Sequence, residues 1–218
     1  YVPYLGVSKE YKTKPAQNSV RDLREAGIQP DVLCVRSDSP INADAFDKMS
    51  LYCDVDKDAI VALPNAETVY EVPLRMEEGG IGDYICAKLL LDCKKPNLKN
   101  WEQLVNKIKA VKPKLKIGVV AKYMSNEDTY LSVFEAIRSA GWYHNVDIDI
   151  LWIDSENISY SKLQDLDLDG IVVPGGFGSR GVEGKIESAK FARETKLPYL
   201  GLCLGMQVAV IEFARKVL

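Results

Sequence analysis

Residues 198–207 read PYLGLCLGMQ, an apolar strand that runs into G-x-C-x-G and continues as an apolar helix. This succession of strand, turn and helix is typical of a nucleophile elbow in an α/β fold, with cysteine in the place of serine. The glycines on both sides of the cysteine allow a sharp turn and a close approach of neighbouring elements. Cys203 is therefore expected at a helix N-terminus, where the dipole and the free N–H groups favour a thiolate. A buried cysteine at a tight turn, without chemistry, is the alternative.

A glycine cluster lies one strand upstream, in residues 171–181, which read IVVPGGFGSRG. Such a loop exposes unhindered backbone N–H groups toward the mouth of the adjacent elbow. The N–H groups of Gly176 and Leu204 could then form an oxyanion hole for an intermediate of acyl transfer.

Two nucleotide-binding interpretations of this region fail. Residues 176–181 match G-x-G-x-x-G, but the next strand ends at Cys203 and not at the acidic residue that a dinucleotide site needs. A P-loop that ends at residues 184–185 would have Ser179 in place of its first glycine and Ile186 after its lysine.

Short apolar strands alternate with amphipathic helices along the chain, which predicts parallel sheets covered on both faces. In the first part we expect strands at 31–36 and 60–63 and helices at 18–26 and 42–52. Residues 73–92 are expected to be mostly helical, with interruptions at Gly79, Gly80 and Gly82. In the second part we expect strands at 116–120, 146–153, 169–173 and 197–202 and helices at 127–140, 184–194 and 204–217. The fold class is thus α/β, with two parallel-sheet units, residues 1–94 and 115–218, joined by a basic linker at 95–114.

Composition narrows the class of protein. The 218 residues carry a formal net charge of −3 and are 47% hydrophobic, which is typical of soluble globular chains and excludes disordered, collagenous and coiled-coil proteins. No apolar run approaches the roughly 20 residues that span a bilayer, so no membrane partner is expected. The near-neutral charge argues against nucleic acid as the main partner.

Five cysteines and one histidine offer no zinc site of the usual spacing, and no metal ligands are expected in the chain. The odd number of cysteines fits a reducing compartment and hence the cytoplasm. All cysteines except Cys203 are expected to be small buried hydrophobic residues, namely Cys34, Cys53, Cys86 and Cys93. The single histidine, His144, is expected in a surface loop. The base that a Cys203 nucleophile needs is therefore expected beyond Leu218.

A third candidate site lies in residues 12–17, which read KTKPAQ and directly precede a helix expected to begin near Asn18. Two lysines and the positive end of a helix form an anion site suited to a polyphosphate. A solvated lysine-rich loop without a ligand is the alternative.

In their order along the chain, these three segments resemble the CTP synthase family. The resemblance extends across nearly the whole chain. The matching stretches are KTKPAQNS at 12–19, IQPDVLCVRSD at 28–38, TVYEVP at 68–73, VPGGFGSRGVEGKI at 173–186 and PYLGLCLGMQVAVIEFAR at 198–215. The resemblance implies that residues 1–94 are the carboxyl-terminal part of a P-loop-type amidoligase domain. It also implies that residues 115–218 are the amino-terminal part of a class I glutamine amidotransferase domain, so that both units are incomplete.

The resemblance implies a role for each site. The full enzyme would aminate UTP to CTP with ATP and Mg²⁺, using ammonia that Cys203 releases from glutamine. Oxyanion stabilisation and glutamine binding would come from Gly176, Leu204, Gly205, Met206 and Gln207. The triphosphate of UTP, or of the feedback inhibitor CTP, would be held by Lys12, Thr13, Lys14, Pro15, Ala16, Gln17 and Lys48. ATP would be held by Pro64, Asn65 and Ala66. A homotetramer, built as a dimer of dimers, and activation by GTP are implied as well.

The chain also departs from the family pattern. The family's P-loop, its acidic magnesium ligands and the histidine and glutamate of its triad have no counterpart here, so the Mg²⁺ ligands are expected outside this chain. The chain alone is therefore expected to be inactive, and the activity is expected of the full-length polypeptide. Two other functions stay open. A free-standing cysteine hydrolase would need His144 near Cys203, and a nucleotide-binding or assembly module would work without catalysis through Lys12, Lys14 and Lys48.

Overall fold

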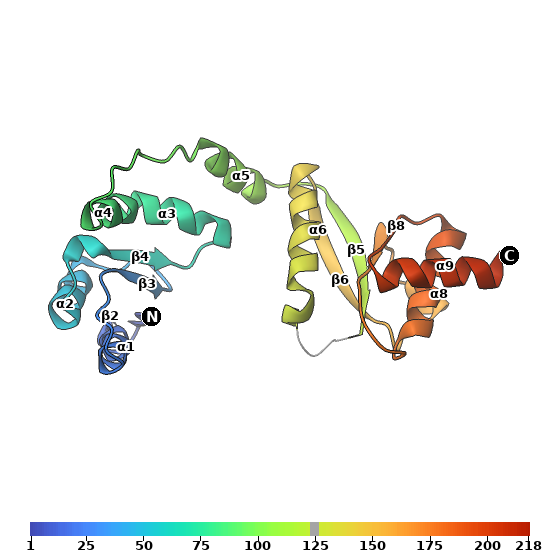
Figure 1. The fold of residues 1–218 in the computed structure, drawn as a ribbon, viewed down its shortest axis with the longest axis horizontal. Coiled ribbons are helices and arrows are strands. Elements are labelled where there is room, and N and C mark those ends of the chain that lie inside the picture. The colour runs from blue at the N-terminus through green and yellow to red at the C-terminus, as the bar shows by residue number, and fades with distance from the viewer. Residues whose placement is uncertain (123–126) are drawn as a thin grey trace. The chain divides into compact units, whose positions relative to one another are not determined.

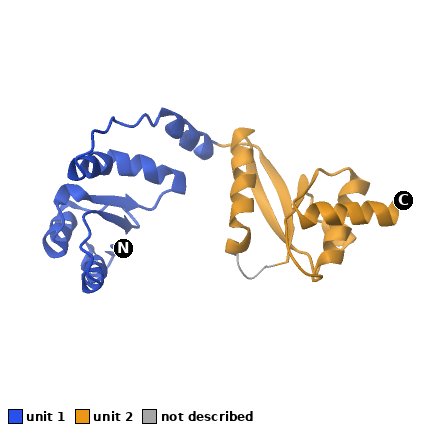
Figure 2. Cartoon of the chain, in the orientation of Figure 1, with its two compact units in different colours: residues 1–110 blue, residues 111–218 orange. Residues whose placement is uncertain are grey.

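The computed structural model describes residues 1–122 and 127–218, and it divides the chain into two compact units, Tyr1–Ala110 and Val111–Leu218 (Figure 2). The division lies inside the segment 95–114, which the sequence suggested as a linker. Helix α5 (Lys99–Lys109) occupies part of that segment and packs on the first unit. There the indole Nε1 of Trp101 donates a hydrogen bond to the carbonyl oxygen of Tyr70 at 2.8 Å.

The first unit is built around two parallel strands, β3 (Leu33–Ser37) and β4 (Ile60–Pro64), connected through helix α2 (Ala43–Cys53) (Figure 1). The strands pair in register from Leu33 opposite Ile60 to Ser37 opposite Pro64. Their buried side chains form one core with those of the neighbouring helices. The other elements are β1 (Tyr4–Leu5), β2 (Glu10–Tyr11), α1 (Lys14–Glu25), α3 (Val72–Glu78), α4 (Ile81–Lys88) and the 3₁₀ turns η1 (Lys57–Ala59) and η2 (Val69–Glu71).

The helix boundaries of the first unit follow their capping residues. Asn42 caps α2 as expected, because its side chain accepts a hydrogen bond from the Ala45 N–H at 3.1 Å. Helix α1, however, begins at Lys14 and not near Asn18. Pro15 fits the first turn of a helix, where its missing N–H costs nothing, and Thr13 takes the N-cap position. Most of the segment 12–17 is therefore helix, and the expectation of a loop was wrong.

The second unit contains one parallel sheet in the order β6-β5-β7-β8. Its strands are β5 (Lys114–Ala121), β6 (Asp147–Asp154), β7 (Gly170–Val173) and β8 (Tyr199–Gly201). Its helices are η3 (Glu127–Tyr130), α6 (Leu131–Tyr143), α7 (Tyr160–Gln164), α8 (Val182–Thr195) and α9 (Leu204–Lys216). The strands and long helices agree with the sequence prediction within a few residues, whereas α7 was not foreseen.

Alternate residues of β5 face opposite layers of this unit. Val120 packs in a core with side chains of α8 and α9, such as Phe191 and Val208. Val119 and Ala121 pack in a second core with Phe134 of α6. The sheet is thus covered on both faces, as its continuous apolar strands predict (Figure 1).

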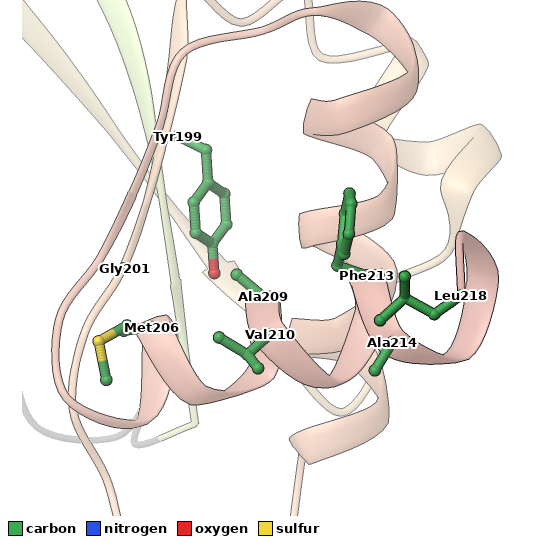
Figure 3. Close-up of a pocket in the computed structure, with 8 residues that line it drawn as sticks. All are labelled: Tyr199, Gly201, Met206, Ala209, Val210, Phe213, Ala214 and Leu218. Carbon is green, nitrogen blue, oxygen red and sulfur yellow. The ribbon is translucent and has the colours of Figure 1, made fainter.

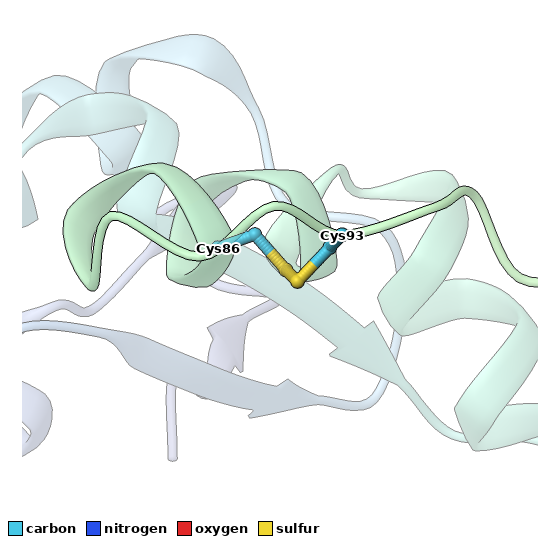
Figure 4. The surroundings of a disulfide bond; sticks show 2 residues. All are labelled: Cys86 and Cys93. Carbon is cyan, nitrogen blue, oxygen red and sulfur yellow. A yellow bond between two sulfur atoms is a disulfide. The ribbon is translucent and has the colours of Figure 1, made fainter.

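The cysteines differ from the sequence prediction. Cys86 and Cys93 form a disulfide between the end of α4 and the chain that follows it (Figure 4). Cys34 is exposed because its position on β3 faces away from the core, and only Cys53 is a buried free cysteine. The expectation of four buried hydrophobic cysteines was therefore wrong for three of them. In the part of the chain that the structure describes, no helix is long and apolar enough to cross a membrane.

Candidate functional site

Cys203 occupies the turn between β8 and α9, at the N-cap position of α9. Its backbone has φ 53° and ψ −106°, a conformation that L-residues rarely adopt. Its carbonyl oxygen accepts hydrogen bonds from the N–H groups of Met206 at 3.1 Å and Gln207 at 3.2 Å, which begin the helix. The side chain is exposed at the carboxyl edge of the sheet. This is the strained, outward-facing geometry that a nucleophile elbow requires.

Two glycines allow this turn to pack tightly. A Cβ on Gly201 would lie 2.5 Å from both Gly205 O and Met206 N in the first turn of α9. A Cβ on Gly205 would overlap the backbone carbonyl group of Val173 at the end of β7. The spacing G-x-C-x-G is thus needed because helix and strands meet backbone to backbone around Cys203.

The glycine cluster after β7 lies against the same turn. A Cβ on Gly175 would be 3.5 Å from Cys203 Cβ and 4.0 Å from its Sγ. A Cβ on Gly176 would be 3.7 Å from Leu204 Cδ2. The structure therefore brings Gly176 and Leu204 together beside Cys203. As the first residue of α9, Leu204 has an N–H group with no acceptor within the helix.

Next to this turn, an apolar groove of about 440 Å³ lies along the exposed face of α9 (Figure 3). Met206 and Gln207, the residues suggested for glutamine binding, are both exposed, whereas Gly205 is buried under the turn. Tyr199 lies in the groove and donates a hydrogen bond from its hydroxyl to Gly205 O at 2.8 Å. Burial raises the pKa of Tyr199, so this hydroxyl keeps its proton and braces the turn.

The structure places the only histidine far from Cys203. His144 ends α6, three residues before β6 starts at Asp147, which pairs with Lys114 at the start of β5. Cys203 lies two residues after Gly201, and Gly201 is level with the carboxyl end of β5. Along β5, the level of Lys114 and the level of Gly201 are six residues apart, which corresponds to about 20 Å. His144 therefore cannot serve Cys203 as a base, which contradicts the free-standing cysteine hydrolase.

The lysines suggested for triphosphate binding gather where β2, α1 and α2 meet. Lys12 is ion-paired with Glu10, and this contact, as the leading cause, lowers the pKa of Glu10. Lys48 pairs with Asp44 at 2.6 Å, and its pKa is raised first by Asp44 and also by Glu10. Lys48 is thus within electrostatic reach of the Lys12–Glu10 pair. Lys14, Pro15, Ala16 and Gln17 form the first turn of α1, and buried Thr13 accepts a hydrogen bond from the Gln17 amide at 3.0 Å.

The segment Pro64, Asn65 and Ala66 lies at the carboxyl edge of β3 and β4. The Asn65 side chain accepts a hydrogen bond from Arg36 at 3.2 Å and donates one to Asp38 at 3.1 Å. Arg75, which the sequence analysis did not single out, donates to Pro64 O at 2.7 Å. Pro64, Asn65 and Arg75 border a hollow of about 840 Å³, large enough for a nucleobase and sugar.

Two buried lysines beside the glycine cluster were also missed. Lys122 and Lys185 are 8% and 0% exposed. Lys185 lies in a stretch that was weighed as the tail of a P-loop and that matches the family, but no sequence signal distinguishes its side chain from that of a solvated helical lysine. Among residues 1–122 and 127–218, no group of three His, Cys, Asp or Glu side chains could hold a metal ion.

Comparison with known proteins matches both units. Residues 1–91 match the family model described as the CTP synthase N-terminus, and residues 126–218 match class-I glutamine amidotransferase. The CTP synthase of Carboxydothermus hydrogenoformans is 52% identical over 99% of this chain and 41% of its own length. Those of Bacillus velezensis and Roseiflexus castenholzii are 46% and 52% identical over 100% of this chain and 41% and 40% of theirs. The chain thus spans about two fifths of the length of these relatives.

One solved structure that resembles this chain is described as the glutaminase domain of Trypanosoma brucei CTPS with bound acivicin. It is 44% identical, covers 47% of this chain and 41% of that chain, and has a TM-score of 0.44.

Proposed function

Because the chain belongs to the CTP synthase family, we propose that it is part of a longer polypeptide that aminates UTP to CTP with ATP and glutamine. The observation that carries this proposal is the Cys203 turn, with its positive φ and the glycine loop against it. The second unit would release ammonia from glutamine, and the first would bind the nucleotides.

In the second unit, Cys203 Sγ attacks the carbonyl carbon of the glutamine side-chain amide. A carbon–sulfur bond forms while the carbonyl electrons move to oxygen, and the N–H groups of Gly176 and Leu204 stabilise that oxyanion. The carbon–nitrogen bond then breaks, and the NH2 group takes up the proton of the thiol and leaves as ammonia. Water hydrolyses the thioester to glutamate and returns the Cys203 thiol. Met206 and Gln207 would contact the bound glutamine. The proton must be handled by a base outside the described residues, since His144 is at the opposite edge of the sheet.

In the first unit, the nucleotides would bind at the two places described above. Lys12, Lys14 and Lys48 provide three ammonium groups for the triphosphate of UTP or of CTP, and Lys14 adds the positive end of α1. The hollow at Pro64, Asn65 and Ala66 would hold ATP. ATP would phosphorylate the uracil 4-oxygen, and ammonia would displace that phosphate. No described cluster of carboxylates suits Mg²⁺, so we assign it no step and no ligand in this chain.

Assembly and regulation are proposed from family membership. We propose a cytoplasmic homotetramer arranged as a dimer of dimers, inhibited by CTP and activated by GTP. The net charge of −3 supports a role without nucleic acid. The exposed edge of β8 and the apolar groove along α9 support a longer chain, because further segments of the polypeptide would cover them.

The test is CTP formation by the full-length polypeptide from UTP, ATP and glutamine, followed by chromatography. We expect CTP, ADP and glutamate in equal amounts. Glutamate without CTP would indicate a glutaminase alone and contradict the proposal. Binding of UTP with neither product would favour the non-catalytic nucleotide module.

A further inference from the structure

Lys122 follows β5 and reaches the glycine loop after β7. Its Nζ donates a hydrogen bond to the carbonyl oxygen of Phe177. A Cβ on Gly178 would lie 3.8 Å from the same Nζ. The lysine is only 8% exposed, so it is held at this position by the surrounding packing. Lys122 therefore fixes the loop at the residue directly after Gly176.

Lys185 approaches the same loop from α8. Its side chain is fully buried, and its Nζ would lie 3.5 Å from a Cβ on Gly176. Among the described residues this Nζ has no hydrogen-bond partner. Burial, and then the charge of Lys122, lower the pKa of Lys185. A buried ammonium without a partner is costly and calls for an explanation.

The position of both ammonium groups relative to Cys203 suggests an explanation for the buried charge. Gly175 packs against Cys203, Gly176 packs against Leu204, and the two lysines contact the same loop. A positive charge under this loop becomes favourable when negative charge develops beside Cys203, because a water-excluded site screens the attraction weakly.

We propose that Lys122 and Lys185 are positioning residues of the glutamine-hydrolysing site. Lys122 holds the Phe177 carbonyl, and Lys185 supports the Gly176 peptide with a buried positive charge, so that the loop is pre-arranged for the oxyanion. The inference rests on the proposed function, because it assigns the lysines a part in that reaction. Neither lysine touches glutamine.

The experiment compares Lys122→Met and Lys185→Met in the full-length polypeptide. Methionine is close to lysine in volume and removes only the ammonium group. We expect kcat for glutamine hydrolysis to fall about tenfold to hundredfold, which is the range for a slight misplacement of catalytic groups, with KM changed less than about threefold. Lys122→Arg keeps a donor and should recover most of the lost rate. Lys116→Met is the matched control, since Lys116 lies on β5, the strand that Lys122 follows, and donates to a remote carbonyl, Leu166 O, at 3.1 Å.

Several outcomes would overturn the inference. One is an unchanged kcat in both methionine variants, and another is an equal loss in Lys116→Met. A third is a loss of kcat that only follows a loss of folded protein, as measured by thermal unfolding. If Lys122→Met does not fold, Lys185→Met and Lys122→Arg decide. A wild-type protein without glutaminase activity would overturn the proposed function as well, whereas an active wild type with unaffected lysine variants overturns the inference alone.

Discussion

Replacing Gly201 by alanine tests how closely strand and helix must meet at the nucleophile turn. The new Cβ would lie 2.5 Å from Gly205 O and from Met206 N, while real Cβ atoms essentially never come closer than about 3.0 Å to such neighbours. At least 0.5 Å of movement is therefore needed between β8 and the first turn of α9, and both atoms are backbone. Overpacking of this kind costs about 1–3 kcal/mol, and a rigid backbone neighbour places Gly201→Ala near 3 kcal/mol. For a unit of this size we expect the melting temperature to fall by about 10–20 °C.

The assay is urea unfolding of the second unit, followed by the fluorescence of Trp142 and Trp152. The matched control is Gly170→Ala on β7, where the nearest atom to a new Cβ is the flexible Ile117 Cδ1 at 3.2 Å. We expect the control to change stability by less than about 1 kcal/mol. If Gly201→Ala costs no more than Gly170→Ala, the close approach of β8 and α9 does not limit the residue at this turn.

Three further predictions concern charged residues. Because the pKa of Lys185 is lowered in the folded state, the unfolded chain binds more protons between that pKa and 10.5, so stability should rise as the pH increases through this window. Urea midpoints measured against pH should lose that rise in Lys185→Met; an identical profile would contradict the assignment. Arg193→Met should lower the urea midpoint more than Arg215→Met does, because the first change leaves the buried carboxylate of Glu212 without its partner, whereas Arg215 forms an exposed ion pair. In the full-length polypeptide, Lys14→Glu should abolish UTP binding in calorimetry and leave the basal glutaminase rate intact; unchanged UTP affinity would place the triphosphate elsewhere.

Most of the fold could be predicted from the sequence, because long apolar strands and capped helices carry strong local signals. Asn42 identifies the start of α2, and the strands of the second unit follow from their apolar runs. The two-residue strands β1 and β2 are too short to show a periodic pattern. Helix α7 has only five residues, although Ser159 does cap it. The start of α1 was misplaced because Asn18 is a plausible cap, whereas Pro15 was the better signal.

The candidate site was predictable only in its backbone. Cys203 and the glycines around it have a spacing that specifies a turn, and the structure brings Gly176 and Leu204 to that turn. The burial of Lys122 and Lys185 depends on how α8 and β5 pack, and a lysine in a sequence is expected at the surface. The Cys86–Cys93 pairing has no signature either, since connectivity cannot be read from cysteine positions alone.

We propose that Cys203 supplies ammonia to a nucleotide-binding unit of the same polypeptide. The most direct measurement is CTP formation by full-length Cys203→Ala with either glutamine or ammonium chloride as nitrogen donor. Cys34→Ala, at an exposed cysteine of the first unit, is the control. We expect Cys203→Ala to lose glutamine-dependent CTP formation and to keep the ammonia-dependent rate, while Cys34→Ala keeps both. Glutamine-dependent CTP formation that survives in Cys203→Ala would contradict this role of Cys203.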